Sequence, residues 1–286
     1  MAAAPRVCTV LIGRRRIREN CVLPSNLMVG GSDCGTAQGV ALVVPCFNEA
    51  ARLDVRRFRS YLAEEQATRL IFVDDGSTDE TACVLKQLAD GYPDRITILG
   101  SRPNRGKAEA VRLGLNHALH AFELEVAGYW DADLATPLES ANRFVCVLNE
   151  RPGIEMVFGS RVKLLGRYVE RRPARHYLGR VFATVVSQML HLPIYDTQCG
   201  AKLFRVTPVF RQVLEQAFLS KWVFDVEIIA RFMKLYGNDP KRLEEIIYEY
   251  PLEAWVDIPG SKVRPKDFLT AFQDLVRIKR RYLSGN

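Results

Sequence analysis

The sequence has no hydrophobic run long enough to cross a membrane as a helix. Such a helix needs about 20 consecutive apolar residues. The nearest candidate, residues 181–195, is interrupted by Ser187 and Gln188. The first residues also lack the order of a secretory signal, because apolar residues 7–12 precede the arginines at 14–16 instead of following them. We therefore expect neither a helical membrane span nor a signal peptide.

Paired cysteines and cysteine clusters of the metal-binding kind are missing as well. No Cys-x-x-Cys pair and no Cys/His group has the spacing of a zinc site. The odd, scattered set favours reduced thiols in a cytosolic protein, several of them packed in the core. The seven cysteines are Cys8, Cys21, Cys34, Cys46, Cys83, Cys146 and Cys199.

Internal repeats and low-complexity tracts are also absent. With 286 residues, of which 48% are hydrophobic and 26% charged, the chain has a globular composition, which excludes collagen-like, coiled-coil and wholly disordered proteins. Residues 1–38 show neither helical nor strand periodicity, and we interpret them as a flexible leader. We expect one domain over residues 39–265 and a basic amphipathic helix and tail over residues 266–286.

The charge balance is basic. Forty Lys and Arg residues against 33 Asp and Glu residues give a net charge of +7. This balance favours an anionic partner, and nucleic acid, a phosphorylated metabolite and an anionic membrane surface all qualify.

Apolar strands alternate with helical segments through the first half of the sequence. A continuous apolar run, stopped by Pro45, predicts a strand buried on both faces. Such alternation predicts an α/β fold with a mostly parallel central sheet flanked by helices, and ligands of these sheets bind beyond the carboxyl ends of the strands. We predict strands over residues 40–44, 70–73, 96–99 and 126–130, and helices over residues 53–66, 78–88 and 106–120.

The second half is less regular. Its patterns predict a strand at residues 156–158, a basic stretch over 167–180 that is followed by an apolar helix to residue 192, and a loop over 196–202. Further helices are predicted over residues 222–235 and 266–283, with a strand at 246–250 between them.

Asp131 and Asp133 directly follow a predicted strand. Residues two apart at the end of a strand project to the same side, so both carboxylates can face one divalent cation. Mg²⁺ or Mn²⁺ held by one or two carboxylates takes its other ligands from water and phosphates. The alternative is a surface turn with two solvated acids.

Asp74 and Asp75 follow another predicted strand. Paired acids at this position can accept hydrogen bonds from the ribose hydroxyls or the base of a nucleoside. The alternative is a turn with a helix cap, which Gly76, Ser77 and Asp79 support equally well. Both interpretations hold together if Asp79 caps the helix.

The segment Asn104–Lys107 precedes a predicted helix, where backbone amides and cations can meet a phosphate. It is not a P-loop, because the earlier glycine is replaced by Ser101 and the Ser/Thr by Ala108. This difference argues against a simple nucleoside triphosphatase. The alternative is a solvated, basic helix start.

Taken together, these segments resemble the family 2 inverting glycosyltransferases of GT-A fold, and within them the dolichyl-phosphate β-glucosyltransferases and other polyprenyl-phosphate glycosyltransferases. The resemblance extends from residue 39 to about residue 284. The matching segments are Pro45–Glu49, Asp74–Ser77, Asn104–Lys107, Asp131–Asp133, Gly159–Arg161, Asp196–Phe204, Lys221–Glu227 and Pro259–Val263.

The resemblance implies roles for individual residues. Asp131 and Asp133 would hold Mg²⁺ or Mn²⁺, and Arg161 and Arg180 would bind the phosphate of the acceptor. Relatives often carry a glutamine two positions after the second aspartate as a further metal ligand, and this sequence has Ala135 there. The residues implied in nucleotide-sugar binding are Pro45, Phe47, Glu49, Asp74, Asp75, Lys107 and Asp131.

The implied reaction transfers a hexose to dolichyl phosphate or another polyprenyl phosphate. The implied hexose is glucose, with UDP-glucose as the donor. The anomeric carbon is inverted, which gives a β-linked product. The main alternatives are a GDP-mannose-dependent polyprenyl-phosphate mannosyltransferase and a soluble glycosyltransferase that acts on a sugar hydroxyl. A hydroxyl acceptor requires a carboxylate base, for which Asp225 and Glu227 are the candidates. For a phosphate acceptor we expect Asp225 to order the site. The residues implied in the reaction are Asp133, Asp225, Arg161 and Arg180.

The lipid acceptor implies a membrane partner without a spanning helix. Arginines at positions 167 to 175 precede the apolar helix, and the terminal helix carries Arg277, Lys279, Arg280 and Arg281 beside its apolar residues. Basic amphipathic segments lie in the interface of anionic membranes. We expect peripheral attachment at the cytoplasmic face. We expect no nucleic acid partner, because acids at strand ends repel phosphate unless a cation intervenes. The apolar face of the terminal helix is predicted from Phe268, Leu269, Phe272, Leu275, Val276 and Leu283.

Overall fold

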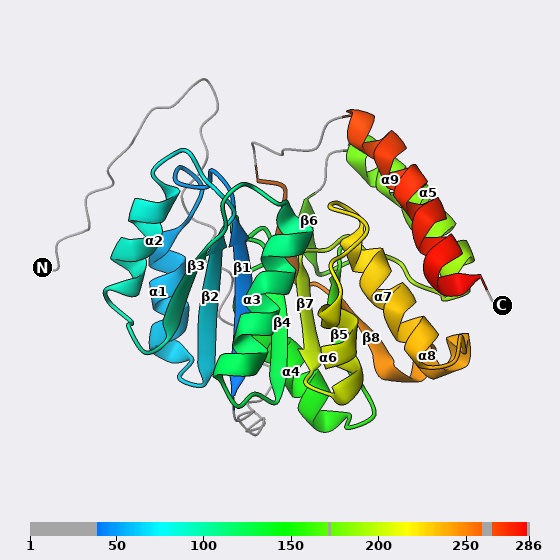
Figure 1. The fold of residues 1–286 in the computed structure, drawn as a ribbon, viewed down its shortest axis with the longest axis horizontal. Coiled ribbons are helices and arrows are strands. Elements are labelled where there is room, and N and C mark those ends of the chain that lie inside the picture. Colours follow the sequence, from blue (N-terminus) through cyan, green and yellow to red (C-terminus); the bar gives the residue numbers. More distant parts are fainter. Residues whose placement is uncertain (1–38, 171–172, 259–264, 285–286) are drawn as a thin grey trace, which may run out of the picture. The chain divides into compact units, whose positions relative to one another are not determined.

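The computed structural model describes residues 39–170, 173–258 and 265–284, without the side chains of 173–178 and 265–269 (Figure 1). The predicted leader, the matching segment Pro259–Val263 and the side chains of five residues in the predicted basic and apolar segments therefore lie outside the described residues. These five are Arg171, Arg172, Arg175, Phe268 and Leu269.

The described residues form a seven-stranded sheet in the order β3-β2-β1-β4-β7-β5-β8. All neighbours pair in parallel except β7, which runs antiparallel to both β4 and β5. The mostly parallel sheet predicted from the sequence is thus confirmed. Its strands are β1 (Val40–Cys46), β2 (Thr68–Asp74), β3 (Ile96–Gly100), β4 (Val126–Trp130), β5 (Met156–Ser160), β7 (Ala201–Arg205) and β8 (Ile247–Pro251). A separate parallel pair joins β6 (Tyr168–Glu170) to β9 (Ala254–Val256).

Helices cover both faces of the sheet. Side chains alternate along each buried strand, so every strand contributes apolar side chains to two separate cores. In β1, Ala41 and Val43 face one core, and Val40, Leu42 and Val44 face the other. The second core is completed by α1 (Val55–Glu64), α2 (Thr81–Ala89) and α4 (Ser140–Glu150). The first is completed by α3 (Lys107–Ala121), α5 (Pro173–Leu190), α6 (Pro208–Glu215), α7 (Phe224–Leu235), α8 (Pro240–Ile246), α9 (Pro265–Ile278) and the π-helical turn η1 (Lys279–Leu283).

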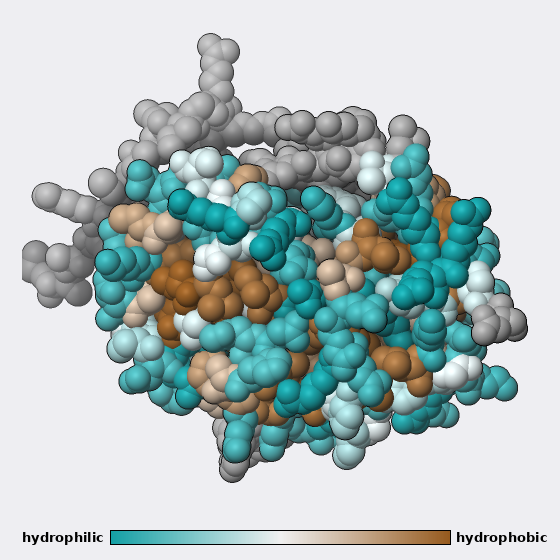
Figure 2. All heavy atoms as spheres, viewed as in Figure 1, coloured by the Kyte–Doolittle hydropathy of each residue, from teal (hydrophilic) through white to brown (hydrophobic). Residues whose placement is uncertain are grey.

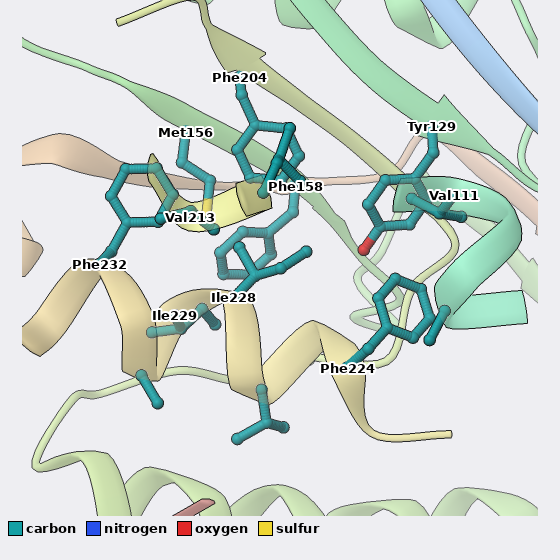
Figure 3. Close-up of a cluster of buried hydrophobic side chains, with 14 of the residues drawn as sticks. Val111, Tyr129, Met156, Phe158, Phe204, Val213, Phe224, Ile228, Ile229 and Phe232 are labelled. Atoms are coloured by element: carbon teal, nitrogen blue, oxygen red, sulfur yellow. The ribbon is translucent and has the colours of Figure 1, made fainter. Parts of the chain in front are cut away.

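Aromatic rings of α7 pack against aromatic rings of the sheet (Figure 3). Phe204 of β7 stacks on Phe210 with the ring centroids 4.6 Å apart, and on Phe232 of α7 at 6.4 Å. Tyr129 of β4 and Phe224, at the start of α7, lie 5.5 Å apart. Burial of such rings contributes strongly to stability. The packing therefore fixes the first turn of α7, which carries Asp225, against the carboxyl end of β4.

Hydrophilic side chains predominate on the face shown in Figure 2, with a group of hydrophobic ones over β2 and β3 at the edge of the sheet. The opposite end of the described structure holds α5 and α9, which lie side by side in Figure 1 and touch through Phe182 and Phe272, whose ring centroids are 6.1 Å apart. No described helix is long and apolar enough to span a membrane.

Among the predicted boundaries that differ from the structure, three bear on the site. The first strand does not stop at Pro45, because β1 continues to Cys46, whose carbonyl accepts a hydrogen bond from the Asp75 amide at 2.8 Å. The predicted loop 196–202 ends at residue 200, where the antiparallel strand β7 begins. The predicted helix after the basic stretch begins at Pro173, so this helix includes part of that stretch.

Candidate active site

A cavity of about 700 Å³ opens beside the carboxyl ends of β1, β2 and β4. Every residue that the sequence analysis assigned to binding or reaction lines this cavity, with the exceptions of Asp74 and of Glu227, the alternative candidate base. Residues from distant parts of the chain therefore meet, as expected for the carboxyl edge of a parallel sheet. The predicted residues in the cavity wall are Pro45, Phe47, Glu49, Asp75, Lys107, Asp131, Asp133, Arg161, Arg180 and Asp225.

Asp131 and Asp133 lie close enough to influence each other. Burial, followed by the negative charge of Asp131, raises the pKa of Asp133. Each carboxylate has a cation in contact: Lys107 Nζ lies 2.5 Å from Asp131 Oδ1, and Arg52 Nη2 lies 2.6 Å from Asp133 Oδ2. Two converging carboxylates suit a hard divalent cation, provided that other ligands complete its shell. No group of three or more His, Cys, Asp or Glu side chains that could hold a metal occurs among the described residues.

Asp74 and Asp75 have separate tasks. Asp74 Oδ1 accepts a hydrogen bond from the Ser77 amide at 3.0 Å, which is the turn considered as the alternative. Asp75 accepts hydrogen bonds from the amides of Arg105, at 2.8 Å, and Gly106, at 2.7 Å. Gly106 has φ of 93°, a conformation that glycine adopts without strain. Asp75 thus fixes the loop before α3, and with it the position of Lys107.

The expected helix cap at Asp79 is wrong, because the N-cap of α2 is Glu80, which makes no side-chain cap hydrogen bond, and Asp79 lies one residue earlier. The Asp79 carboxylate accepts hydrogen bonds from the Thr81 amide at 3.0 Å and from the Ala50 amide at 3.2 Å. The second bond connects the loop after β1 to the segment before α2. Asp79 therefore holds together two loops at the carboxyl edge of the sheet.

Lys107 is the central cation of the cavity. Burial alone lowers the pKa of its ammonium group, but the carboxylates of Asp131, Asp225 and Asp133 outweigh burial and raise it. The ring of Phe224 adds a further contact, with its centroid 6.0 Å from Nζ. Lys107 therefore stays charged at neutral pH.

Arg161 and Arg180 add two guanidinium groups to the lining of the cavity. Arg161 forms a bidentate ion pair with Asp196, through Nε at 2.6 Å and Nη2 at 2.7 Å. Arg180 of α5 donates a hydrogen bond from Nη1 to the Tyr195 carbonyl at 3.1 Å, and its guanidinium lies 3.7 Å from the centroid of the Tyr195 ring. Both guanidinium groups are thus oriented by neighbours on the segment before β7.

Asp225 is buried in an ion pair with Lys202. Lys202 Nζ lies 2.5 Å from Asp225 Oδ1, the same oxygen that accepts a hydrogen bond from the Tyr129 hydroxyl. Lys202 Nζ also donates to the carbonyls of Thr197, at 3.0 Å, and Cys199. The pair therefore ties the first turn of α7 to the loop that borders the cavity.

Glu227, the other candidate base, does not line the cavity. Its carboxylate accepts hydrogen bonds from the Leu219 and Ser220 amides and pairs with Arg231 at 2.7 Å. The Tyr282 hydroxyl of η1 donates to it at 3.0 Å. Glu227 therefore anchors the terminal helix to α7.

The sequence analysis missed three polar residues of this network. Arg52 bridges Glu49, at 3.2 Å, and Asp133, and Asp196 holds Arg161. The third is Lys202 of β7, which is 1% exposed. A charge that is buried this completely requires partners.

Comparison with known proteins places the chain among sugar-transferring enzymes. Residues 41–210 match the family described as Glycosyl transferase family 2. The chain is 31% identical over 260 residues to a dolichyl-phosphate beta-glucosyltransferase of Dictyostelium discoideum, with 86% of this chain and 75% of that protein covered. It is 32% identical over 263 residues to the protein of the same name from Homo sapiens, with 86% and 76% covered.

Solved structures share the fold. A glucosyl-3-phosphoglycerate synthase from Mycobacterium tuberculosis, in complex with Mn²⁺, UDP-glucose and glycerol 3-phosphate, gives a TM-score of 0.60 at 18% identity, over 88% of this chain and 83% of that one. A mannosyltransferase from Pyrobaculum calidifontis, in complex with GDP-Man and Mn²⁺, gives 0.57 at 21% identity, over 90% and 67%. The predicted α/β architecture is therefore shared with these enzymes.

Proposed function

The chain belongs to glycosyl transferase family 2, and from this premise we propose that it transfers glucose from UDP-glucose to dolichyl or another polyprenyl phosphate. The observation that carries the proposal is the composition of one cavity, whose lining includes the carboxylates of Asp131 and Asp133 together with the cations of Lys107, Arg161 and Arg180. Relatives named dolichyl-phosphate beta-glucosyltransferase, at 31% and 32% identity, support the choice of sugar and acceptor.

In this proposal the nucleotide sugar binds at the ends of β1, β2 and β4. Pro45, Phe47 and Glu49 line the nucleoside side of the cavity together with Asp75, whose carboxylate is positioned by the loop before α3. Lys107 presents its ammonium group to the diphosphate. Asp74, which the sequence analysis included, forms a turn outside the cavity wall and has no contact role in this scheme.

A divalent cation fits the residues present. Asp131 and Asp133 would supply two carboxylates that lie close enough for Asp131 to raise the pKa of Asp133, and a diphosphate with water would supply the remaining ligands. Mn²⁺ occurs in the complexes of both structural relatives described above, and we propose Mg²⁺ or Mn²⁺ for this chain. When bound, the ion would offset the negative charge that develops on the departing diphosphate.

The acceptor phosphate is already a nucleophile at neutral pH. A monophosphate has a second pKa of about 6 and is largely a dianion, so no general base is needed. We assign its binding to Arg161 and Arg180, because a guanidinium fork binds phosphate in two places and neutralises it. A single in-line attack on the anomeric carbon then gives the inverted, β-linked product. Asp225, held by Lys202, orders the site without taking a proton.

The ion pair of Asp225 also bears on the alternative acceptor. A sugar hydroxyl would need a base, and Asp225 is the candidate base that lines the cavity. Its Oδ1 already accepts hydrogen bonds from Tyr129 and Lys202, so this oxygen is engaged within the protein and is not free to accept one from a sugar hydroxyl. This arrangement supports the phosphate acceptor over the hydroxyl acceptor.

The experiment that tests the proposal is a product assay. The purified chain is incubated with Mn²⁺ or Mg²⁺, a polyprenyl phosphate and either UDP-glucose or GDP-mannose, and the lipid product is identified by mass. We expect a hexosyl phosphate lipid from UDP-glucose, its loss with EDTA or with Asp133→Asn, and unchanged turnover in Glu244→Gln, an exposed carboxylate of α8. A product from GDP-mannose alone would contradict the assignment of the sugar. Transfer to a free sugar alone would contradict that of the acceptor.

A further inference from the structure

Arg52 lies in the turn between β1 and α1 and reaches across to the predicted metal site. Its Nη1 lies 3.2 Å from Glu49 Oε2, and its Nη2 lies 2.6 Å from Asp133 Oδ2. The side chain is 20% exposed, and its Nε is buried without a hydrogen-bond partner among the described residues. The guanidinium is therefore held through its two terminal nitrogens, each on a different carboxylate.

The two aspartates of the site are thus already in contact with donors of the protein itself. Both oxygens of Asp133 are engaged, Oδ2 by Arg52 and Oδ1 by the Ala135 amide at 3.2 Å. Lys107 occupies Asp131 Oδ1 at 2.5 Å. A divalent cation needs these same oxygens, and it is repelled by a fixed positive charge beside them. Arg52 and the cation therefore compete for Asp133.

We propose that Arg52 is an internal counter-ion of the Asp131–Asp133 pair that keeps the divalent cation weakly bound until a nucleotide diphosphate arrives with it. Glu49 makes the exchange easy, because Arg52 already touches this second carboxylate and keeps a partner when it leaves Asp133. The inference rests on the metal site of the proposed function and adds to it a positioning residue. It predicts a coupling between cation and nucleotide that depends on Arg52.

The test measures Mn²⁺ binding by electron paramagnetic resonance of the free ion at pH 7.5, with and without UDP. In Arg52→Gln we expect the Kd for Mn²⁺ alone to fall by roughly tenfold, since one unit charge at contact distance is removed. UDP should then strengthen Mn²⁺ binding less in this variant than in the wild type. Arg52→Lys, which keeps the charge, should stay near the wild type.

The matched control is Arg56→Gln, which removes the same charge from an exposed side chain close by in the chain and should leave the Kd unchanged. Arg52→Met is the second uncharged variant, for use if Arg52→Gln does not fold. An unchanged or weaker affinity in the uncharged variant would overturn the role of Arg52. Absence of Mn²⁺ binding in the wild type with UDP would overturn this inference and the metal site together. A missing lipid product beside the expected Mn²⁺ results would overturn the proposed function alone.

Discussion

Arg180 is the residue whose substitution tests the acceptor most cleanly. Arg161 is less suited, because its removal leaves Asp196, whose side chain is 7% exposed, without its bidentate partner and so costs stability. Arg180 instead contacts a carbonyl and a ring of Tyr195. We expect Arg180→Ala to raise the KM for the polyprenyl phosphate by roughly tenfold or more, as for a lost charge-assisted bond, with little change in the KM for UDP-glucose.

Steady-state kinetics with each substrate varied in turn measure this effect. Arg143→Ala on α4 serves as the control, since its exposed side chain lies on a helix that packs on the other face of the sheet. Equal changes in both KM values would assign Arg180 to the general architecture of the cavity instead of to the acceptor.

Gly200 shows that a residue without a side chain can set the geometry of the site. A Cβ atom at this position would overlap the carboxylate of Asp131, whose amide donates a hydrogen bond to the Gly200 carbonyl at 2.9 Å. We expect Gly200→Ala to turn the Asp131 carboxylate away and to weaken binding of Mn²⁺ with UDP by about tenfold or more. The overlap is with a side chain and not with backbone, so the fold should survive.

Titration calorimetry with Mn²⁺ and UDP, with a thermal unfolding curve as the folding check, measures this change. Gly153→Ala is the matched control, because a Cβ there meets nothing within 4 Å. If Gly200→Ala binds as tightly as the wild type, the observed position of Asp131 is not the one used for binding.

The sequence predicted which residues at the ends of the parallel strands belong to the candidate site, but it did not predict the residues that form ion pairs with them. Asp75 and Asp131 follow apolar runs, and the parallel topology itself brings such positions to one edge. Arg52 comes from a turn, and Lys202 from an antiparallel strand that crosses between β4 and β5. Their positions depend on how distant segments pack, which local periodicity does not contain.

At the scale of elements, the helix α3 lies unusually close to the sheet. A Cβ at Gly114 would overlap Val43 of β1 and approach Val73 of β2 to 2.9 Å. A glycine inside a helix normally costs about 1 kcal/mol relative to alanine. Here we expect the reverse, with Gly114→Ala lowering the free energy of unfolding by about 1–3 kcal/mol, because the helix must move away from two valines.

Urea denaturation monitored by circular dichroism measures this difference. Gly91→Ala, just after α2, is the control, since a Cβ there meets only the Leu88 carbonyl at 3.7 Å. A stabilised Gly114→Ala would mean that the packing of α3 on the sheet is looser than the distances indicate.

The prediction of elements succeeds where one period dominates. Continuous apolar runs locate β1, β2 and β4, because strands buried on both faces need no polar side. The segment of β7 contains Lys202, whose charge favours a loop in the sequence-based prediction. The structure explains this charge inside a strand, because Lys202 forms an ion pair with Asp225. In α4, Ala141, Phe144 and Leu148 have helical spacing and are buried, a signal that would have located this helix.

The whole molecule has a net charge of +7, and its last helix confirms only part of the apolar face that was predicted for it. The expected single apolar face is divided. Ala271, Leu275, Ile278 and Tyr282 are buried in the core, whereas Phe272 is 38% exposed and Val276 50%. Val181 of the neighbouring α5 is 57% exposed. The described outer side of α9 thus places a few apolar side chains beside Arg277 and the exposed cations of η1.

We propose that this outer side meets an anionic membrane surface, where the proposed lipid acceptor would be found. Each cation near such a surface contributes about 1 kcal/mol. We expect the protein to sediment with vesicles that contain phosphatidylserine at low salt, and to be released as salt screens the attraction. Replacing Lys279, Arg280 and Arg281 together by Gln should reduce the bound fraction by tenfold or more.

The control is a second triple variant, in which Arg56, Lys86 and Arg143 are replaced by Gln. These residues are exposed on α1, α2 and α4, so the variant removes the same net charge and should reduce the bound fraction far less. Equal losses in the two triple variants would show that overall charge, and not the surface of α9 and η1, drives the attachment.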